Sequence, residues 1–215
     1  MSPTARAQDS EDTIPWVSFS YGGGTYAMEN VNTDIHNVER QAGIPFDEIT
    51  SGYGFDIGVG MDVGSFFRLG LHFQRIQAES SLSDGVATLE YRYPASAIYV
   101  GMAAMRPATS RLKYGIEIGL GLTLSSGEAE LSGAGLFDAK SELGGTGPYF
   151  AARGIFDIKI TGMLAFSTGV GYRYAATHEM SADGIPITDN DGLPFSIDYS
   201  GFEAQAGIRF FFVRN

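Results

Sequence analysis

The feature that most constrains this chain is an alternation of apolar residues with glycine or polar residues, repeated along most of its length. Its clearest example runs from Gly52 to Asp62, where Tyr, Phe, Ile, Val and Met alternate with Gly and Asp. Residues 112–125 repeat it, with Glu117 on the polar side and Ile118 on the apolar side. A period of two places neighbouring residues on opposite faces, so these segments are predicted to be β-strands. No run of about 18 apolar residues occurs, which excludes a transmembrane helix.

The alternation defines eight segments, which lie at about 16–28, 52–62, 67–74, 86–102, 112–125, 149–160, 164–174 and 201–212. The fourth segment meets Pro94, which indicates a bulge and leaves the phase of the strand beyond it open. Short connections alternate with long ones: 63–65, 103–111 and 159–162 are short, whereas 29–51, 78–85, 126–147 and 175–196 are long. Short turns on one rim and long loops on the other are typical of outer-membrane barrels.

The direction of the apolar faces follows from volume, because a soluble barrel with apolar residues inside would show the same period. Most of the 15 Phe and 11 Tyr residues lie on the apolar faces, and we place Tyr93 and Tyr99 among them. The interior of an eight-stranded barrel is too narrow for so many rings. The apolar faces must therefore point outward, and a belt of that size requires a bilayer. Lipid also demands internally paired backbone groups, which a closed barrel provides.

The predicted fold is therefore all-β, an eight-stranded antiparallel up-and-down transmembrane β-barrel. We assign residues 15–213 to the barrel and expect residues 1–14 to form a flexible N-terminal segment. Ala5 and Ala7 precede a polar stretch, which is the pattern at the end of a secretory signal peptide. An ordinary disordered N-terminus fits this feature equally well, and we assign segment 1–14 to a signal-peptide remnant.

Composition excludes several functional classes. The chain has no Cys, so a disulfide scaffold is excluded. Its formal net charge of −11 argues against nucleic-acid binding, because phosphate contacts need clustered Lys and Arg. The glycine-rich runs do not open a helix after a strand, so they are interpreted as lumen packing and not as a nucleotide loop. No cofactor or metal is predicted.

Several motifs carry a resemblance to a known family: residues 54–60 (GFDIGVG), 114–121 (YGIEIGLG), 169–174 (GVGYRY) and 200–210 (SGFEAQAGIRF). They resemble the small outer-membrane β-barrels, such as the membrane domain of outer membrane protein A, outer membrane protein X and the opacity-type proteins. The resemblance covers about residues 16–212. It implies a Gram-negative-type outer membrane after signal-peptide removal, contact with the lipid bilayer and lipopolysaccharide, and insertion by the outer-membrane assembly machinery. In that family the machinery recognises a C-terminal strand that ends in an aromatic residue, whereas three residues follow Phe212 here.

The polar faces carry both signs of charge. We predict a lumen ion-pair network formed by Asp56, Arg68, Glu90, Arg92, Glu117, Arg153, Asp157, Arg173, Glu203 and Arg209. Arginine pairs carboxylates through two parallel hydrogen bonds, which favours a structural network that fills the core. The alternative is a polar path for small solutes or protons, and a conductance measurement separates the two.

The long loops hold most of the acidity. Segment 29–51 carries five acidic residues against Arg40, and segment 175–198 has no Lys or Arg. Residues 189–192 (DNDG) are similar to the start of a calcium loop but lack its closing Glu, so solvated loop charge is favoured. The apolar stretch 131–137 either contacts a partner or prolongs two strands into a hairpin, which we favour.

Enzymes such as lipid A deacylases and palmitoyltransferases exist on this scaffold, so the histidines are candidate catalytic groups. His72 faces the lumen, while His36 and His178 lie in loops, and the sequence places none beside a nucleophile. We predict a non-enzymatic outer-membrane protein with a structural or surface-interaction role through its acidic loops, which offer a surface to an extracellular or envelope protein partner. A narrow pore or carrier is the alternative, and a lipid A-modifying enzyme ranks third.

Overall fold

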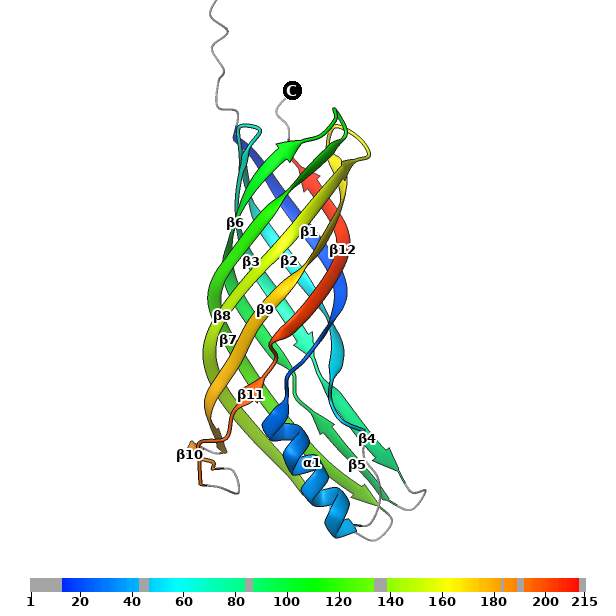
Figure 1. Cartoon of the computed structure of the whole chain (residues 1–215), viewed down its shortest axis with the longest axis vertical. Coiled ribbons are helices and arrows are strands. Elements are labelled where there is room, and N and C mark those ends of the chain that lie inside the picture. The colour runs from blue at the N-terminus through cyan, green and yellow to red at the C-terminus, as the bar shows by residue number, and fades with distance from the viewer. Residues whose placement is uncertain are drawn as a thin grey trace, which may run out of the picture.

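A computed structural model describes residues 13–42, 47–83, 87–133, 139–182, 184–188 and 192–212. The elements, in chain order, are β1 (Thr13–Thr25), α1 (Glu29–Ala42), β2 (Ser51–Val63), β3 (Phe67–Gln77), β4 (Glu79–Ser83), β5 (Ala87–Arg92), β6 (Ala95–Pro107), β7 (Leu112–Gly133), β8 (Ala139–Lys159), β9 (Leu164–Ala182), β10 (Ile185–Pro186), β11 (Ile197–Asp198) and β12 (Gly201–Phe211). Figure 1 shows a tall cylinder of tilted strands with the C-terminal end at the rim opposite α1.

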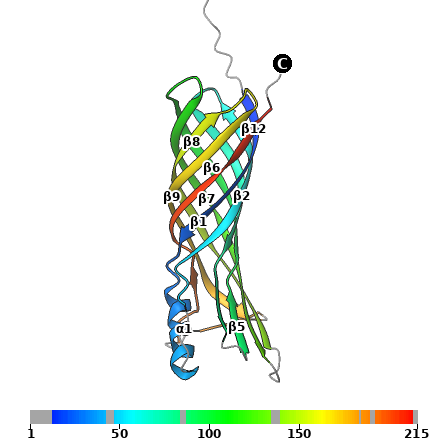
Figure 2. The same cartoon turned by 90° about the vertical axis from the view of Figure 1, so that its right-hand side faces the viewer.

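Eight of these strands close into a ring. Its order is β1, β2, β3, β6, β7, β8, β9 and β12, every neighbouring pair is antiparallel, and β12 pairs with β1 from Trp16↔Phe211 to Gly24↔Glu203. Consecutive strands of the ring lie side by side all around the barrel (Figures 1 and 2). The predicted eight-stranded up-and-down barrel is confirmed. Because the ring has no free edge, every strand pairs its backbone on both sides.

Side chains alternate between the two surfaces of this wall, as the sequence predicts. Leu71, Leu120 and Val170 are more than half exposed on the outer surface, whereas Asp56 and Arg153 are buried inside. Among the described residues of the ring strands, the exposed large side chains are aliphatic or aromatic except Arg106, His178 and Glu179, which lie toward the two ends. This outer belt suits hydrocarbon and not water.

Glycines on the inner face make room for large neighbours. A Cβ at Gly60 or at Gly70 would lie 2.6 Å from the indole of Trp16, the one Trp of the chain, which is buried inside the barrel. The abundance of glycine on the polar face therefore reflects the packing of a crowded lumen.

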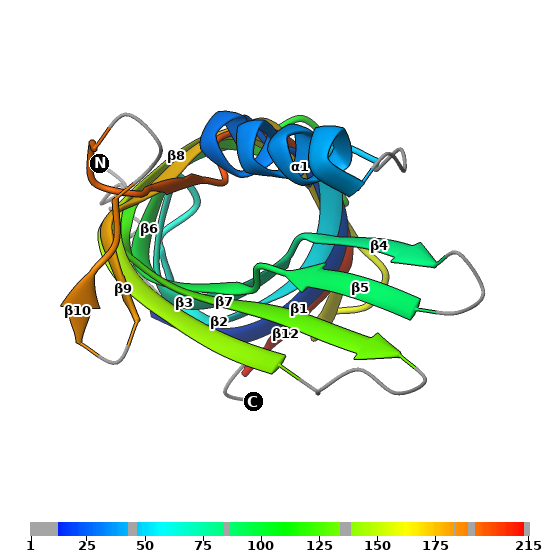
Figure 3. The same ribbon diagram turned by 90° about the horizontal axis from the view of Figure 1, so that it is seen from below.

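The end opposite the termini extends well beyond the ring. Strands β7 and β8 continue to Gly133 and Ala139 as one long hairpin, which agrees with the hairpin favoured for residues 131–137, although residues 134–138 lie outside the described residues. The β4–β5 hairpin adds to the same extension by pairing β5 with β7. Figure 3, which views this end along the barrel axis, shows the extensions projecting to one side of the ring.

The interpretation of segment 29–51 as loop alone is wrong in part, because Glu29–Ala42 forms α1. Val31 and Ile35 form its apolar face, and they are buried with Met28, which directly precedes the helix, in a cluster that includes Ile49 and Tyr199. Asn32 ties the helix to the returning chain, because its amide accepts a hydrogen bond from the Ile49 N–H at 2.8 Å. No helix in the described part of the chain is long and apolar enough to cross a membrane.

Two boundaries also differ from the predictions. Thr13 and Ile14, which we assigned to the N-terminal segment, begin β1, and residues 1–12 lie outside the described residues. The fourth predicted segment is two strands, because Tyr93 and Pro94 separate β5, which pairs with β7 beyond the ring, from β6, which pairs with β3 inside it. The stretch 189–191 of the weak calcium-loop motif is not among the described residues either.

Candidate functional site: the polar lumen

Arg153 on β8 stands at the centre of the lumen network and is 2% exposed. Its guanidinium donates to the phenol oxygens of Tyr99 and Tyr149, both at 2.6 Å. It also donates to Glu117 at 3.1 Å and to Glu203. The four partners come from β6, β8, β7 and β12, so one side chain ties together strands on several sides of the ring.

A second cluster lies nearer the short turns and centres on Asp157. Its carboxylate accepts hydrogen bonds from Arg68 and Arg209, each at 2.7 Å, and from the Ser167 hydroxyl at 2.7 Å. Arg68 also donates to Asp62 at 2.7 Å. Both guanidinium groups lie over the Trp16 ring, at 5.7 and 4.8 Å from its centroid, which adds cation–π attraction.

Asp56, His72 and Tyr99 lie between the two clusters. The His72 Nδ1 lies 2.9 Å from a carboxylate oxygen of Asp56, and the Tyr99 hydroxyl donates to the other oxygen at 2.7 Å. The His72 ring stacks on Tyr99, with centroids 4.8 Å apart, and tilts against Trp16 at 5.8 Å. Aromatic and charged contacts therefore link both clusters.

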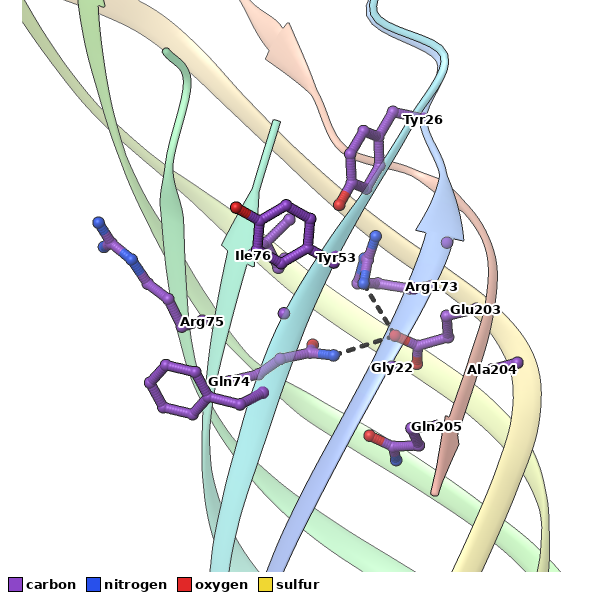
Figure 4. A pocket seen from close by; sticks show the side chains of 14 residues that line it. Gly22, Tyr26, Tyr53, Gln74, Arg75, Ile76, Arg173, Glu203, Ala204 and Gln205 are labelled. Carbon is purple, nitrogen blue, oxygen red and sulfur yellow. Dashed lines mark hydrogen bonds and ion pairs between the residues drawn. The ribbon is translucent and has the colours of Figure 1, made fainter. Parts of the chain in front are cut away.

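Toward the long-loop end the network continues through Glu203 (Figure 4). Its carboxylate accepts from Arg173 at 2.8 Å and from the Gln74 amide at 3.0 Å. Between Glu203 and the long-loop end, the side chains inside the barrel become apolar. They form one cluster that joins the lumen-facing Tyr99 and Tyr149 to Met28, Ile76 and Tyr199. Burial raises the pKa of Tyr26, which lies in this region after β1, to about 12, so its phenol stays neutral.

The structure brings together most of the residues proposed for the lumen network: Asp56, Arg68, Glu117, Arg153, Asp157, Arg173, Glu203 and Arg209 are all buried inside the barrel. Glu90 and Arg92 are corrected, because they lie on β5 beyond the ring, and Arg92 is exposed. The break at Pro94 explains the error, since it moves β5 off the barrel wall.

Sequence reasoning missed several members of the network. Tyr99 was expected on the outer belt but is buried, because the phase of β6 could not be followed through Pro94. Tyr93, also expected on the belt, lies in the break between β5 and β6 and is buried in the apolar cluster. Asp62 and Gln74 occupy polar positions of the alternating pattern in β2 and β3, and that pattern was sufficient to include them. Tyr149 is in phase with Ala151 and Arg153, so the alternation of residues 149–153 was also sufficient to place it inside.

The histidines do not converge on a catalytic arrangement. His36 contacts Glu39 at 3.0 Å and Glu48 at 2.8 Å, and these carboxylates raise its pKa. His178 is exposed on β9, and His72 is the buried partner of Asp56. Among the described residues, no group of three or more His, Asp or Glu side chains is placed to hold a metal ion.

Two small cavities lie in the described part of the lumen. A cavity of about 30 Å³ is lined by polar side chains that include Ser18, His72 and Glu117, and the cavity of Figure 4, beside Gln74 and Glu203, measures about 20 Å³. Such volumes hold one or two water molecules. Small-molecule sites are at least about ten times larger.

Comparison with known proteins adds to this geometry. No protein family and no curated protein sequence matches the chain. Among solved structures, a major outer membrane protein from Thermus thermophilus superposes with a TM-score of 0.55 at 10% identity, over 92% of this chain and 99% of that one. The chain has the fold of the small outer-membrane β-barrels.

Two further structures cover the chain with lower scores. Neisserial surface protein A has 13% identity and a TM-score of 0.45, covering 94% of this chain and 100% of its own. The Escherichia coli outer membrane protease OmpT has 10% identity and a TM-score of 0.46, covering 94% and 98%. At such identities the likeness describes the fold alone, so the role must be argued from the residues of this chain.

Proposed function

We propose that the protein is a closed, non-enzymatic barrel of the outer membrane, with both termini on the periplasmic side. Its role is structural, or it docks an extracellular or envelope protein partner through its acidic outer end. The observation that carries this proposal is the filling of the lumen by the Arg153 network and by the apolar cluster above it. Lipopolysaccharide, the bilayer and the assembly machinery are its proposed contacts in the membrane.

The outer end has the features of a presented surface. Helix α1 is fixed by buried contacts and by the hydrogen bond from Asn30 to Ser196 at 2.9 Å, so its polar face is held in place. That face and the following segment carry Glu39, Asp47 and Glu48, and the long loops have few cations. Negative charge on a rigid support favours a basic partner.

The closed lumen predicts that the purified protein forms no stable open channels in planar bilayers. The two lumen cavities are too small for a solute, and the charged side chains between them are ion-paired. Heat-modifiable gel mobility of the same sample verifies that the barrel is folded. Steady single-channel conductance from the folded protein would instead favour the pore or carrier. Altered lipid A in mass spectra of cells that produce the protein would favour an enzyme.

A further inference from the structure

The short-turn rim differs in charge from the rest of this acidic protein. Arg106, Arg111, Lys113 and Lys159 lie at or beside the turns that follow β6 and β8. The turn segments 63–67, 107–112 and 159–164 contain no Asp or Glu. The formal net charge of the chain is −11, so this rim is a local basic site on an acidic molecule.

A shallow cleft that is largely open to solvent lies between two neighbouring turns of this rim. It has a volume of about 350 Å³ and is lined by Ser110, Arg111, Lys159, Ile160, Thr161 and Gly162. The turns are held together by the Lys159 N–H, which donates to the Arg111 carbonyl at 2.7 Å. The cleft is far larger than the cavities of the lumen and is accessible from solvent.

Both cations of the cleft are available to a ligand. Within the described ranges, neither the Arg111 guanidinium nor the Lys159 ammonium makes an ion pair, whereas the adjacent Lys113 lies 3.6 Å from the Asp62 carboxylate. The threonine hydroxyls hold the backbone of the turns: Thr109 accepts from the Leu112 N–H at 3.0 Å and Thr161 from the Met163 N–H at 3.2 Å. The cleft is therefore a preformed site with two positive charges.

The apolar belt reaches the edge of the cleft. Ile158, Ile160 and Met163 are each about half exposed or more, and they continue the outer face of β8 and β9 to the turns. A ligand in the cleft can thus place a charged group between Arg111 and Lys159 while its hydrocarbon lies against these side chains. Arginine and lysine both bind phosphate, arginine through paired hydrogen bonds.

We propose that this cleft binds the phosphate of an anionic glycerophospholipid in the leaflet that meets the short turns. Arg111 and Lys159 contact the phosphate, Ser110 lies beside it, and the acyl chains lie along Ile158 and Ile160. The inference is independent of the role of the acidic loops, because it concerns the opposite end of the barrel.

Native mass spectrometry tests this site with the protein in lipid nanodiscs that contain phosphatidylglycerol and phosphatidylcholine in equal amounts. We expect phosphatidylglycerol to be retained preferentially, and Arg111→Gln or Lys159→Gln to lower its retention about fivefold each. Arg106→Gln is the matched control, because it removes one charge from the same rim outside the cleft. Heat-modifiable mobility shows that each variant is folded.

Three outcomes would overturn the proposal. Equal retention of both lipids would mean that the cleft does not recognise the anionic headgroup. An equal loss in Arg106→Gln would mean that the rim attracts lipid by diffuse charge. Competition by inorganic phosphate that abolishes the preference would assign the cleft to a soluble anion.

Discussion

Replacing Arg153 by methionine is expected to lower the free energy of unfolding by about 3–5 kcal/mol. The substitution removes the cation while leaving the buried carboxylates of Glu117 and Glu203 in place. It also leaves the phenols of Tyr99 and Tyr149 without their donor. Urea unfolding in lipid vesicles, followed by the fluorescence of the buried Trp16, measures the change.

A matched variant distinguishes the effect of breaking the lumen network from the effect of removing one positive charge. Arg106→Met makes the same substitution at an exposed rim position outside the cleft and should change the free energy of unfolding by no more than about 0.5 kcal/mol. Adding Glu117→Gln and Glu203→Gln to Arg153→Met should recover part of the stability, since the groups are coupled. If Arg153→Met lowered the free energy of unfolding as little as Arg106→Met, the network would not support the barrel.

Ile118→Arg is expected to destabilise the inserted barrel by about 2–4 kcal/mol. Ile118 lies near the middle of the membrane-facing part of β7 and points outward, 43% exposed. A guanidinium there would have to enter hydrocarbon. The fraction of protein that folds into lipid vesicles, read from heat-modifiable gel mobility, reports the effect.

Glu117→Gln provides the comparison at the next residue. Glu117 points inward, where a glutamine can still accept the hydrogen bond from Arg153. We expect folding yields well above those of Ile118→Arg. Equal yields for the two variants would mean that the faces of the strand have been assigned the wrong way round.

The barrel could be predicted because lipid and a crowded lumen impose opposite requirements on alternate residues. These requirements do not apply outside the membrane, and there the sequence analysis did not predict α1. Met28 just before the helix and Val31 and Ile35 within it follow helical spacing, so a period of 3.6 applied to residues 28–42 was the signal that could have found it.

The lumen was harder to predict than the wall. The alternating pattern identifies which side chains point inward but not which of them meet, because the partners of Arg153 come from strands far apart in sequence. A single break in the alternation also misplaces several residues at once. Pro94 is such a break, and it led to the wrong placement of Tyr99, Glu90 and Arg92. Pairings inside a barrel depend on strand stagger, which one sequence does not fix.

The claim that the apolar face of the strands contacts lipid is tested most directly by the quenching of tryptophan fluorescence by brominated lipids. Val59 on β2 is exposed on the outer face, at nearly the same height as the inward Trp16, which pairs with Gly60. In vesicles of brominated lipid, the variant Trp16→Phe/Val59→Trp should be quenched several times more strongly than the native protein. If native Trp16 were quenched more strongly than the variant, the polar face would lie against lipid, and the assignment of the two faces would be wrong.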